Sequence, residues 1–383
     1  MKNFLFQLPS KIHFGEGIVS KIGYELKCRN MQKTLIVTDS GIVDAGLTTV
    51  IEDSLKYHGI EYILFDKVQA NPNTQIIYQG AELYQESGCC SLVAIGGGSC
   101  IDSAKAIGIL ATNGGKVEDY EGFGHVKNPL PFIVAIPTTY GTGSEVSTAT
   151  IVTDEIRHVK MFIGSDYLAP AIAMIDPLLL IALPFKIAAS TGLDALTHAI
   201  ESYVSINENP FSDSLNEYAI RTISKNLLPA ASTNDNVEAT SYMVTASCMT
   251  AIAFNYTALG LVHGIAHALG GLYNIPHGVA NALLLPYVME YNLLSKPHKF
   301  ARIAELMGED INGITDVEAG YKSVIAVKRM SKLLGIPEKL SEIGIEPDKF
   351  TTIAQFALKD GNVGFNPRTV RLDNIISILN SAL

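Results

Sequence analysis

The chain has 383 residues, more than a single hydrophobic core usually supports, so two domains are expected. A formal net charge of −10 argues against a nucleic-acid or anionic-membrane surface, and no apolar run predicts a transmembrane helix or a signal peptide. Five scattered cysteines without a C-x-x-C pair are typical of free thiols in a reducing compartment, so we expect a cytoplasmic protein.

In the first half of the chain, short runs rich in β-branched residues alternate with helical patterns. Strands are predicted at 34–39, 62–66, 91–98, 131–139 and 171–177. Helices are predicted between them, up to about residue 58, over 74–88 and over 100–112. Strands that are apolar along their whole length are typical of a parallel sheet covered by helices on both faces. We therefore expect an α/β domain over residues 1–183.

Beyond residue 183 the apolar residues recur at intervals of three and four, and strand signals almost disappear. This spacing predicts helices at 215–228, 239–255, 277–294, 299–307 and 324–335. We therefore expect a second, all-helical domain over residues 184–383.

Two loops that follow predicted strands have the composition of a cofactor cradle. The sequence Gly96-Gly97-Gly98-Ser99 ends a buried strand and opens a helix, whose exposed N–H groups would suit a pyrophosphate. The second loop, PTTYGTGS at 137–144, is rich in hydroxyls and glycines. Either loop alone could be a tight turn between a strand and a helix, but two such loops in one parallel sheet favour a nucleotide.

Asp39 ends the first strong strand, and the glycine loop comes about sixty residues later. The usual dinucleotide fingerprint has the opposite order, so the topology must be a variant. Asp39 could accept a hydrogen bond from an adenosine ribose hydroxyl and repel the 2′-phosphate of NADP. It could equally be a residue that caps the turn after the strand.

A single divalent metal could be held by Asp194, His198, His263 and His277. Asp194 and His198 are four residues apart in a predicted helix, which places both side chains on one face, about 6 Å apart along the axis. His263 and His267 repeat this spacing, and His277 follows ten residues later. One such pair more often serves packing than metal binding. Two pairs and a further histidine favour a site for Fe²⁺, Zn²⁺, Co²⁺ or Ni²⁺.

Several segments together resemble the iron-containing (group III) alcohol dehydrogenase family: GGGSCIDSAK (96–105), PTTYGTGSEVS (137–147), IDP (175–177), GLDALTHAIESY (192–203), GLVHGIAHALGGLYNIPHGVAN (260–281) and NPR (366–368). The resemblance implies the fold shared with dehydroquinate synthase, in which a dinucleotide-binding domain precedes a helical metal-binding domain. It implies Fe²⁺, with Zn²⁺ as an alternative, held by Asp194, His198, His263 and His277. His267 would be left near the substrate.

The same resemblance implies cofactor contacts at Asp39, Gly97, Gly98, Ser99, Thr138, Thr139, Thr142 and Ser144, and at Lys160 near the nicotinamide. The carboxylate of Asp39 favours NAD as that cofactor over NADP. Asp102 and Lys105 match the glycine motif and are either ligand contacts or ordinary helix-face residues. The chain departs from the family pattern at Tyr140, where alanine is usual, and at Asn362, where cysteine is usual. Because both positions lie beside the expected cofactor and substrate sites, the identity of the substrate does not follow from the resemblance.

We therefore expect an NAD- and Fe²⁺-dependent oxidoreductase that interconverts a small primary alcohol or diol and its aldehyde by hydride transfer. His267 is expected to pass a proton to solvent, although it could instead support a ligand or face the cofactor. Phe254 and Ile151 are expected to line an apolar pocket, and Asn362 could meet a second substrate hydroxyl. We expect a homo-oligomer of at least two chains, with no nucleic-acid or membrane partner.

Three alternatives remain open at this point. The chain could be a Zn²⁺-dependent polyol oxidoreductase similar to glycerol dehydrogenase. It could be a lyase similar to dehydroquinate synthase, although the segments that carry the metal candidates are poor in the Lys and Arg that a polyacidic substrate would need. It could also be a binding protein without turnover.

Overall fold

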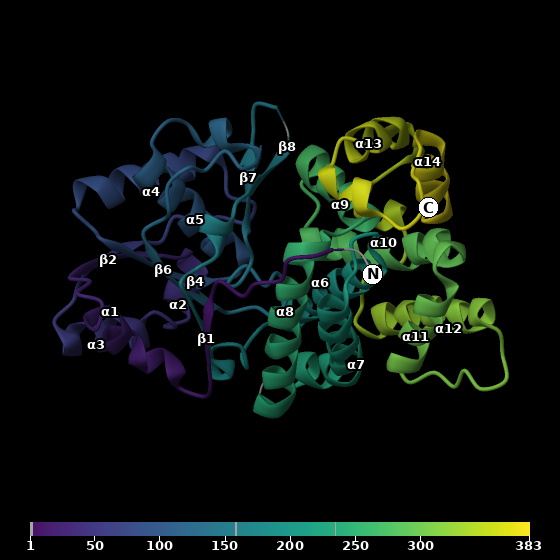
Figure 1. The fold of residues 1–383 in the computed structure, drawn as a ribbon, viewed down its shortest axis with the longest axis horizontal. Coiled ribbons are helices and arrows are strands. Elements are labelled where there is room, and N and C mark those ends of the chain that lie inside the picture. Colours follow the sequence, from purple (N-terminus) through teal and green to yellow (C-terminus); the bar gives the residue numbers. More distant parts are fainter. Residues whose placement is uncertain (1–2, 158, 234) are drawn as a thin grey trace. The chain divides into compact units, whose positions relative to one another are not determined.

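The computed structural model describes residues 3–157, 159–233 and 235–383, and the chain forms two compact units (Figure 1). The first, called here the α/β unit, comprises Gln7–Thr139 and Gly143–Ile181. The second, the helical unit, comprises Ala182–Leu383, the short segment Tyr140–Thr142 and the N-terminal residues up to Phe6.

The α/β unit is built on a parallel sheet with the strand order β1-β9-β6-β4-β2-β3. The predicted strands are confirmed as β2 (Lys33–Val37), β3 (Glu61–Phe65), β4 (Ser91–Gly96), β6 (Phe132–Pro137) and β9 (Ile172–Ile175). Strand β1 (Lys11–Phe14), which pairs with β9 at one edge, was not predicted, because its four residues carry only a weak apolar signal. The expected fold class, a parallel sheet followed by a mostly helical part, is confirmed.

Successive strand residues point to opposite faces of this sheet, and each face is buried under helices. Leu35 and Val37 belong to one apolar cluster, which includes residues of α4 (Thr74–Glu86) and α5 (Gly98–Asn113). Ile36 belongs to a second cluster, which includes residues of α1 (Ile22–Lys27) and α3 (Thr49–His58). Figure 1 shows these two helix pairs on opposite sides of the sheet. Coverage of both faces explains why the strands are apolar throughout.

A small second sheet in the α/β unit has the order β5-β8-β7. Strands β7 (Ala149–Asp154) and β8 (Val159–Gly164) form an antiparallel pair, and β5 (Gly122–Phe123) pairs in parallel with β8. These strands were not predicted. Buried and partly exposed residues alternate along β7, so it lacks the continuous apolar run that marks the strands of the large sheet.

The helical unit contains α6 (Phe185–Val204), α7 (Pro210–Ser232), α8 (Val237–Thr257), α9 (Leu261–Tyr273), α10 (His277–Asn292), α11 (Pro297–Leu306), α12 (Asp316–Leu333), α13 (Phe350–Ala357) and α14 (Leu372–Ser381). The predicted helices are confirmed in α7, α8, α10, α11 and α12. Helix α6 packs against α7, α8 and α10, and α9 packs against α10 and α13.

Local sequence signals explain where several of these helices begin. The side chain of Asn209 accepts hydrogen bonds from the N–H groups of Phe211 and Ser212, with Pro210 at the first position of α7. Thr315 and Glu318 form a capping box at the start of α12. Within the described residues no single helix is long and apolar enough to cross a membrane; α8 and α9 reach that threshold only as a pair bent by 101°.

Candidate metal centre and cofactor edge

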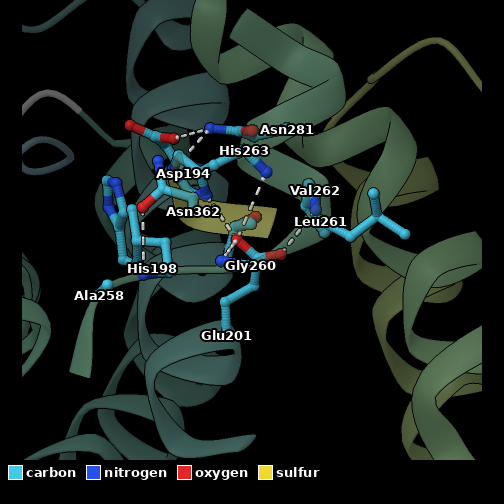
Figure 2. Close-up of polar contacts among 12 residues, drawn as sticks. Asp194, His198, Glu201, Ala258, Gly260, Leu261, Val262, His263, Asn281 and Asn362 are labelled. Atoms are coloured by element: carbon cyan, nitrogen blue, oxygen red, sulfur yellow. Dashed lines mark hydrogen bonds and ion pairs between the residues drawn. The ribbon is translucent and has the colours of Figure 1, made fainter. Parts of the chain in front are cut away.

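Four side chains of the helical unit converge on one point. Ligand atoms of Asp194, His198, His263 and His277 all lie within 4.8 Å of one another. Helix α6 supplies Asp194 and His198, α9 supplies His263, and α10 begins with His277 (Figure 2 labels the first three). Asp194, His198 and His263 are buried, and His277 is partly exposed. The structure therefore brings together the four residues that the sequence singled out as metal ligands.

Close approach of α10 to α6 puts the fourth ligand in reach. A Cβ atom at Gly278 would lie 2.7 Å from the backbone oxygen of Ser190, so any larger residue would push α10 away. Asn274, with φ of 54°, ends α9 in the left-handed conformation, and Pro276 then leads into α10. This sharp turn lets His263 and His277, on consecutive helices, face the same centre.

Two of the histidines are held by their Nδ1 atoms. Nδ1 of His198 lies 3.2 Å from the backbone oxygen of Gly141, and Nδ1 of His263 lies 2.6 Å from Oε2 of Glu201. Each oxygen accepts a hydrogen bond, so each Nδ1 carries the proton and Nε2 keeps its lone pair. Burial lowers the pKa of His198 to about 4, which keeps that ring neutral at physiological pH. Neutral imidazoles with oriented Nε2 atoms are the form that ligates a metal.

The amide of Asn281 shows how the ligand lone pairs are directed. Its Nδ2 atom lies 2.6 Å from Oδ1 of Asp194 and 3.1 Å from Nε2 of both His263 and His277. Three ligand atoms thus surround one electropositive group, as they would surround a cation. One carboxylate oxygen with imidazole nitrogens is a donor set that fits Fe²⁺ or Zn²⁺. The side chains present therefore fit a divalent metal.

Glu201, which was not picked out from the sequence, is buried behind His263. Besides the His263 ring, its carboxylate accepts hydrogen bonds from the backbone N–H groups of Gly260 at 3.1 Å and Val262 at 2.6 Å. Burial raises the pKa of Glu201 to about 7, against the lowering effect of these backbone donors. The sequence spacing does indicate Glu201, because it lies seven residues after Asp194 in the same helix and the two therefore share a face.

His267 lies beside the metal candidates but outside their group. Its ring stacks on that of His277, with centroids 5.3 Å apart. Its Nδ1 atom donates to Oδ2 of Asp360 at 2.6 Å. Burial would raise the pKa of Asp360, but the His267 ring and the hydrogen bonds from His267 and Asn362 outweigh it and hold this pKa at about 2. Asp360 was also missed, because it is 93 residues from its partner.

The residues expected near the substrate have defined surroundings. The ring of Phe254 lies 4.9 Å from that of His198, centroid to centroid. Asn362 donates to Oδ1 of Asp360 and accepts from the N–H of Leu259, so its amide is oriented by the protein. Tyr140 is only 1% exposed, and burial raises the pKa of its phenol well above the usual range. Ile151 belongs to the other unit, where it lies on β7 and donates its N–H to Asp102.

In the α/β unit, the carboxyl ends of β2, β4 and β6 carry the predicted cofactor residues. Strand β3, which follows β2 in the chain, lies on one side of β2, whereas β4 and then β6 lie on the other side. The chain therefore winds in opposite directions from the boundary between β2 and β4. Such a switch point is where open α/β sheets bind ligands. Asp39 follows β2, and Gly97 caps α5 directly after β4, with Gly98 and Ser99 as the first residues of that helix. A glycine cap leaves the first N–H groups of the helix accessible to an anion.

Contacts across this edge join residues that are far apart in sequence. Oδ2 of Asp39 lies 3.3 Å from Sγ of Cys100, and Oδ1 caps α2 (Ser40–Asp44) through the N–H of Ile42. Asp39 thus has the capping contact that was considered for it, and its second oxygen faces the glycine loop. The N–H of Thr138 donates to the oxygen of Gly96, and the Thr139 side chain would lie 3.4 Å from a Cβ at Gly97.

Lys105 and Asp102 form a buried network beneath the hydroxyl-rich loop. Nζ of Lys105 donates to the hydroxyls of Ser144 and Ser147 and to the backbone oxygen of Ala149. Ser144 donates in turn to Asp102. Lys105 is completely buried, and burial lowers its pKa to about 8. These contacts favour the interpretation of Lys105 and Asp102 as residues that shape the loop.

Two predicted cofactor residues are carried by other elements of the structure. Thr142 belongs to the helical unit, and Lys160 lies on β8, opposite Thr153 of β7. Ser144 lies in the loop between β6 and β7 and holds the network just described. The sequence spacing does not show that Thr142 and Lys160 belong to different parts of the structure.

Comparisons with known proteins cover nearly the whole chain. Residues 9–177 match the family model described as iron-containing alcohol dehydrogenase, and residues 188–383 match the C-terminal model of the Fe-containing alcohol dehydrogenase family. The chain is 41% identical to 1,3-propanediol dehydrogenase from Klebsiella pneumoniae, covering 99% of this chain and 98% of the relative. It is 37% identical to NAD-dependent methanol dehydrogenase from Bacillus methanolicus, covering 100% of both. A solved alcohol dehydrogenase from Oenococcus oeni superimposes with a TM-score of 0.97, at 39% identity over 100% of both chains.

Proposed function

Because the chain belongs to the iron-containing alcohol dehydrogenase family, we propose that it interconverts a small primary alcohol or diol and its aldehyde, using NAD(H) and Fe²⁺. The observation that carries the proposal is the convergence of four ligand atoms within 4.8 Å, with Nδ1 of His198 held by Gly141 and Nδ1 of His263 held by Glu201. The relatives support the substrate class, because they include enzymes named for 1,3-propanediol and for methanol.

In this proposal Asp194, His198, His263 and His277 hold the metal. A divalent cation there supplies a Lewis acid that polarises the substrate oxygen. One carboxylate and three neutral imidazoles leave a net charge of about +1 in the centre, which favours negative charge on that oxygen. Phe254, against His198, gives the centre an apolar neighbour that suits a short carbon chain.

The cofactor is proposed to lie at the switch point of the parallel sheet. The N–H groups at the start of α5, from Gly98 and Ser99, are suited to the pyrophosphate, with Thr138 and Thr139 beside them. NAD supplies the hydride acceptor. Asp39 is placed to accept a hydrogen bond from a ribose hydroxyl, and its charge disfavours the 2′-phosphate of NADP. Thr142, Ser144 and Lys160 remain proposed contacts from the family resemblance.

Oxidation of an alcohol removes a hydride from carbon and a proton from oxygen, and we assign the proton to His267. Asp360 holds the proton on Nδ1 of His267, which leaves Nε2 as the ring atom that accepts one. The ring is largely but not completely buried, with 14% of the side chain exposed, so a proton can pass from it to water. In aldehyde reduction the proton moves the other way.

We also propose a cytoplasmic homo-oligomer of at least two chains. The cysteines support the cytoplasmic location, because none of the five forms a disulfide within the described part of the chain, as expected in a reducing compartment. Size-exclusion chromatography with light scattering tests the oligomer directly. A monomer at micromolar concentration would contradict it.

The central experiment uses protein purified without oxygen. Metal content is measured, and NADH oxidation is followed with propanal and 3-hydroxypropanal, before and after chelation and after return of Fe²⁺ or Zn²⁺. We expect about one metal per chain, activity that chelation abolishes, and recovery with Fe²⁺. His277→Ala should lose metal and activity, whereas His298→Ala, at an exposed position on α11, should retain both.

Each alternative predicts a different result. Recovery with Zn²⁺ alone would favour the polyol oxidoreductase, and absence of NADH oxidation with every aldehyde would favour the lyase or the binding protein. Full metal content and activity in both His263→Ala and His277→Ala would refute the assigned centre.

A further inference from the structure

We infer that Glu201 is a positioning residue that fixes the tautomer of His263 and thereby makes that ring a metal ligand. The inference rests on the proposed metal centre and adds a residue to it. Glu201 lies on α6, which also carries Asp194 and His198, so one helix would supply two ligands and orient a third.

The carboxylate of Glu201 is held in place by several donors. It is 4% exposed, and it accepts hydrogen bonds from Nδ1 of His263 at 2.6 Å and from the N–H groups of Val262 at 2.6 Å and Gly260 at 3.1 Å. Gly260 permits this approach, because a Cβ there would lie 2.8 Å from Oε1. The first residues of α9 are thus tied to α6 by the same group that holds the His263 ring (Figure 2).

The neighbours on both sides of the ring select one tautomer. Glu201 accepts from Nδ1, so that atom carries the proton. On the opposite side Nδ2 of Asn281, a donor, lies 3.1 Å from Nε2, which is compatible with a lone pair on that nitrogen. A metal needs that same lone pair. Carboxylates that accept from the outer nitrogen of a ligating histidine generally raise metal affinity by 10- to 100-fold.

Glu201→Gln separates this role from simple packing, because it preserves size but replaces one acceptor oxygen with an NH₂ group. In place of Oε1 that group would face Val262 N–H, and in place of Oε2 it would face Nδ1–H of His263 together with the backbone N–H groups of Gly260 and His263. Because backbone amides cannot give up their hydrogens, the Oε1 position, which meets one of them, is the less costly place for the NH₂ group. We therefore expect the amide oxygen to keep its contact with Nδ1 of His263 as a neutral acceptor, which makes Nε2 a weaker metal ligand than the carboxylate does.

Two measurements test the inference. Competition with a chromophoric chelator gives the Kd for Fe²⁺ or Co²⁺, and ¹⁵N NMR of histidine-labelled, chelated protein shows which ring nitrogen of His263 is protonated. We expect a 10- to 100-fold weaker Kd in the variant, and a proton on Nδ1 of His263 in the native protein. Glu217→Gln, which removes a carboxylate from Arg302 and Tyr203 on the same unit, is the matched control and should change neither.

A Kd for Glu201→Gln within twofold of the native value, or a proton on Nε2 of His263 in the native protein, would overturn the inference. If the variant does not fold, the native spectrum decides, since a proton on Nε2 of native His263 refutes the assignment. Failure of the proposed function would look different: native protein would bind metal without oxidising NADH with any aldehyde, while the Kd and NMR results would stand.

Discussion

Glu145, which directly follows the hydroxyl-rich loop, is expected to make the stability of the folded protein depend on pH. Its side chain is 2% exposed, and burial raises its pKa to about 7, against smaller opposing effects of its own backbone N–H and of Lys105. Glu145→Gln keeps the size of the side chain and removes its ionisation. The variant therefore isolates the free energy of placing a carboxylate at this position.

The magnitude follows from the difference between the folded and unfolded pKa values. A rise from 4.5 to about 7 is about 2.5 pH units, which at about 1.36 kcal/mol per unit is roughly 3 kcal/mol. Since the folded pKa is the higher one, the folded protein binds more protons between these values, and stability falls as pH rises through them. Below pH 4.5 the contribution is fully present, and above pH 7 it is lost.

Urea unfolding of chelated protein at pH 5.0 and pH 8.5 measures this contribution. Relative to the native protein, Glu145→Gln should increase the free energy of unfolding by little at pH 5.0 and by roughly 2 to 3 kcal/mol at pH 8.5. Glu86 is exposed at the end of α4, and Glu86→Gln is the matched control. Its difference in unfolding free energy from the native protein should not increase between pH 5.0 and pH 8.5. A difference between Glu145→Gln and native protein that is the same at both pH values would refute the reasoning.

Three further variants test the other parts of the site. Asp39→Ser should lower the KM for NADP by about tenfold or more and raise that for NAD, because a carboxylate no longer repels the 2′-phosphate; unchanged KM values would contradict its assignment. Lys105→Met should lower the unfolding free energy in urea by roughly 3 to 5 kcal/mol, since it leaves Asp102 buried without its cation; a loss below about 1 kcal/mol would count against the network. Asp360→Asn should reduce kcat by about 100-fold with metal content unchanged, because the carboxylate no longer fixes the His267 tautomer; equal loss of metal would indicate a ligand-supporting role instead.

The parts of the fold that were predicted from sequence are those whose signals are local. Strands β2, β4 and β6 are buried on both faces and read as unbroken apolar runs. The hairpin of β7 and β8 is different, because two of the three buried positions of β7 are the polar residues Thr150 and Asp154, so burial leaves no regular apolar pattern in that strand. Strand β1 depends on its pairing with β9, about 160 residues away, which no local pattern reveals.

The same distinction applies to the metal centre. Asp194 and His198 are on one face of one helix, so their spacing alone predicted a pair of ligands. Asn281 lies four residues after His277, but an amide is not a typical metal ligand, so its type gives no signal for the site. Asp360 contacts His267 across 93 residues, and its importance appears only when the C-terminal segment is seen packed on α9.

The organisation of α6 explains why so short a segment carries so much of the site. Asp194, His198 and Glu201 follow one another at intervals of four and three, so they form a single stripe along the helix. Two members of the stripe face the metal centre, and the third reaches the beginning of α9, where it holds both the backbone and the ring of His263. A rotation of α6 about its axis would therefore displace Asp194, His198 and Glu201 together. The site is better described as one helix face with two helix ends brought to it than as four independent ligands.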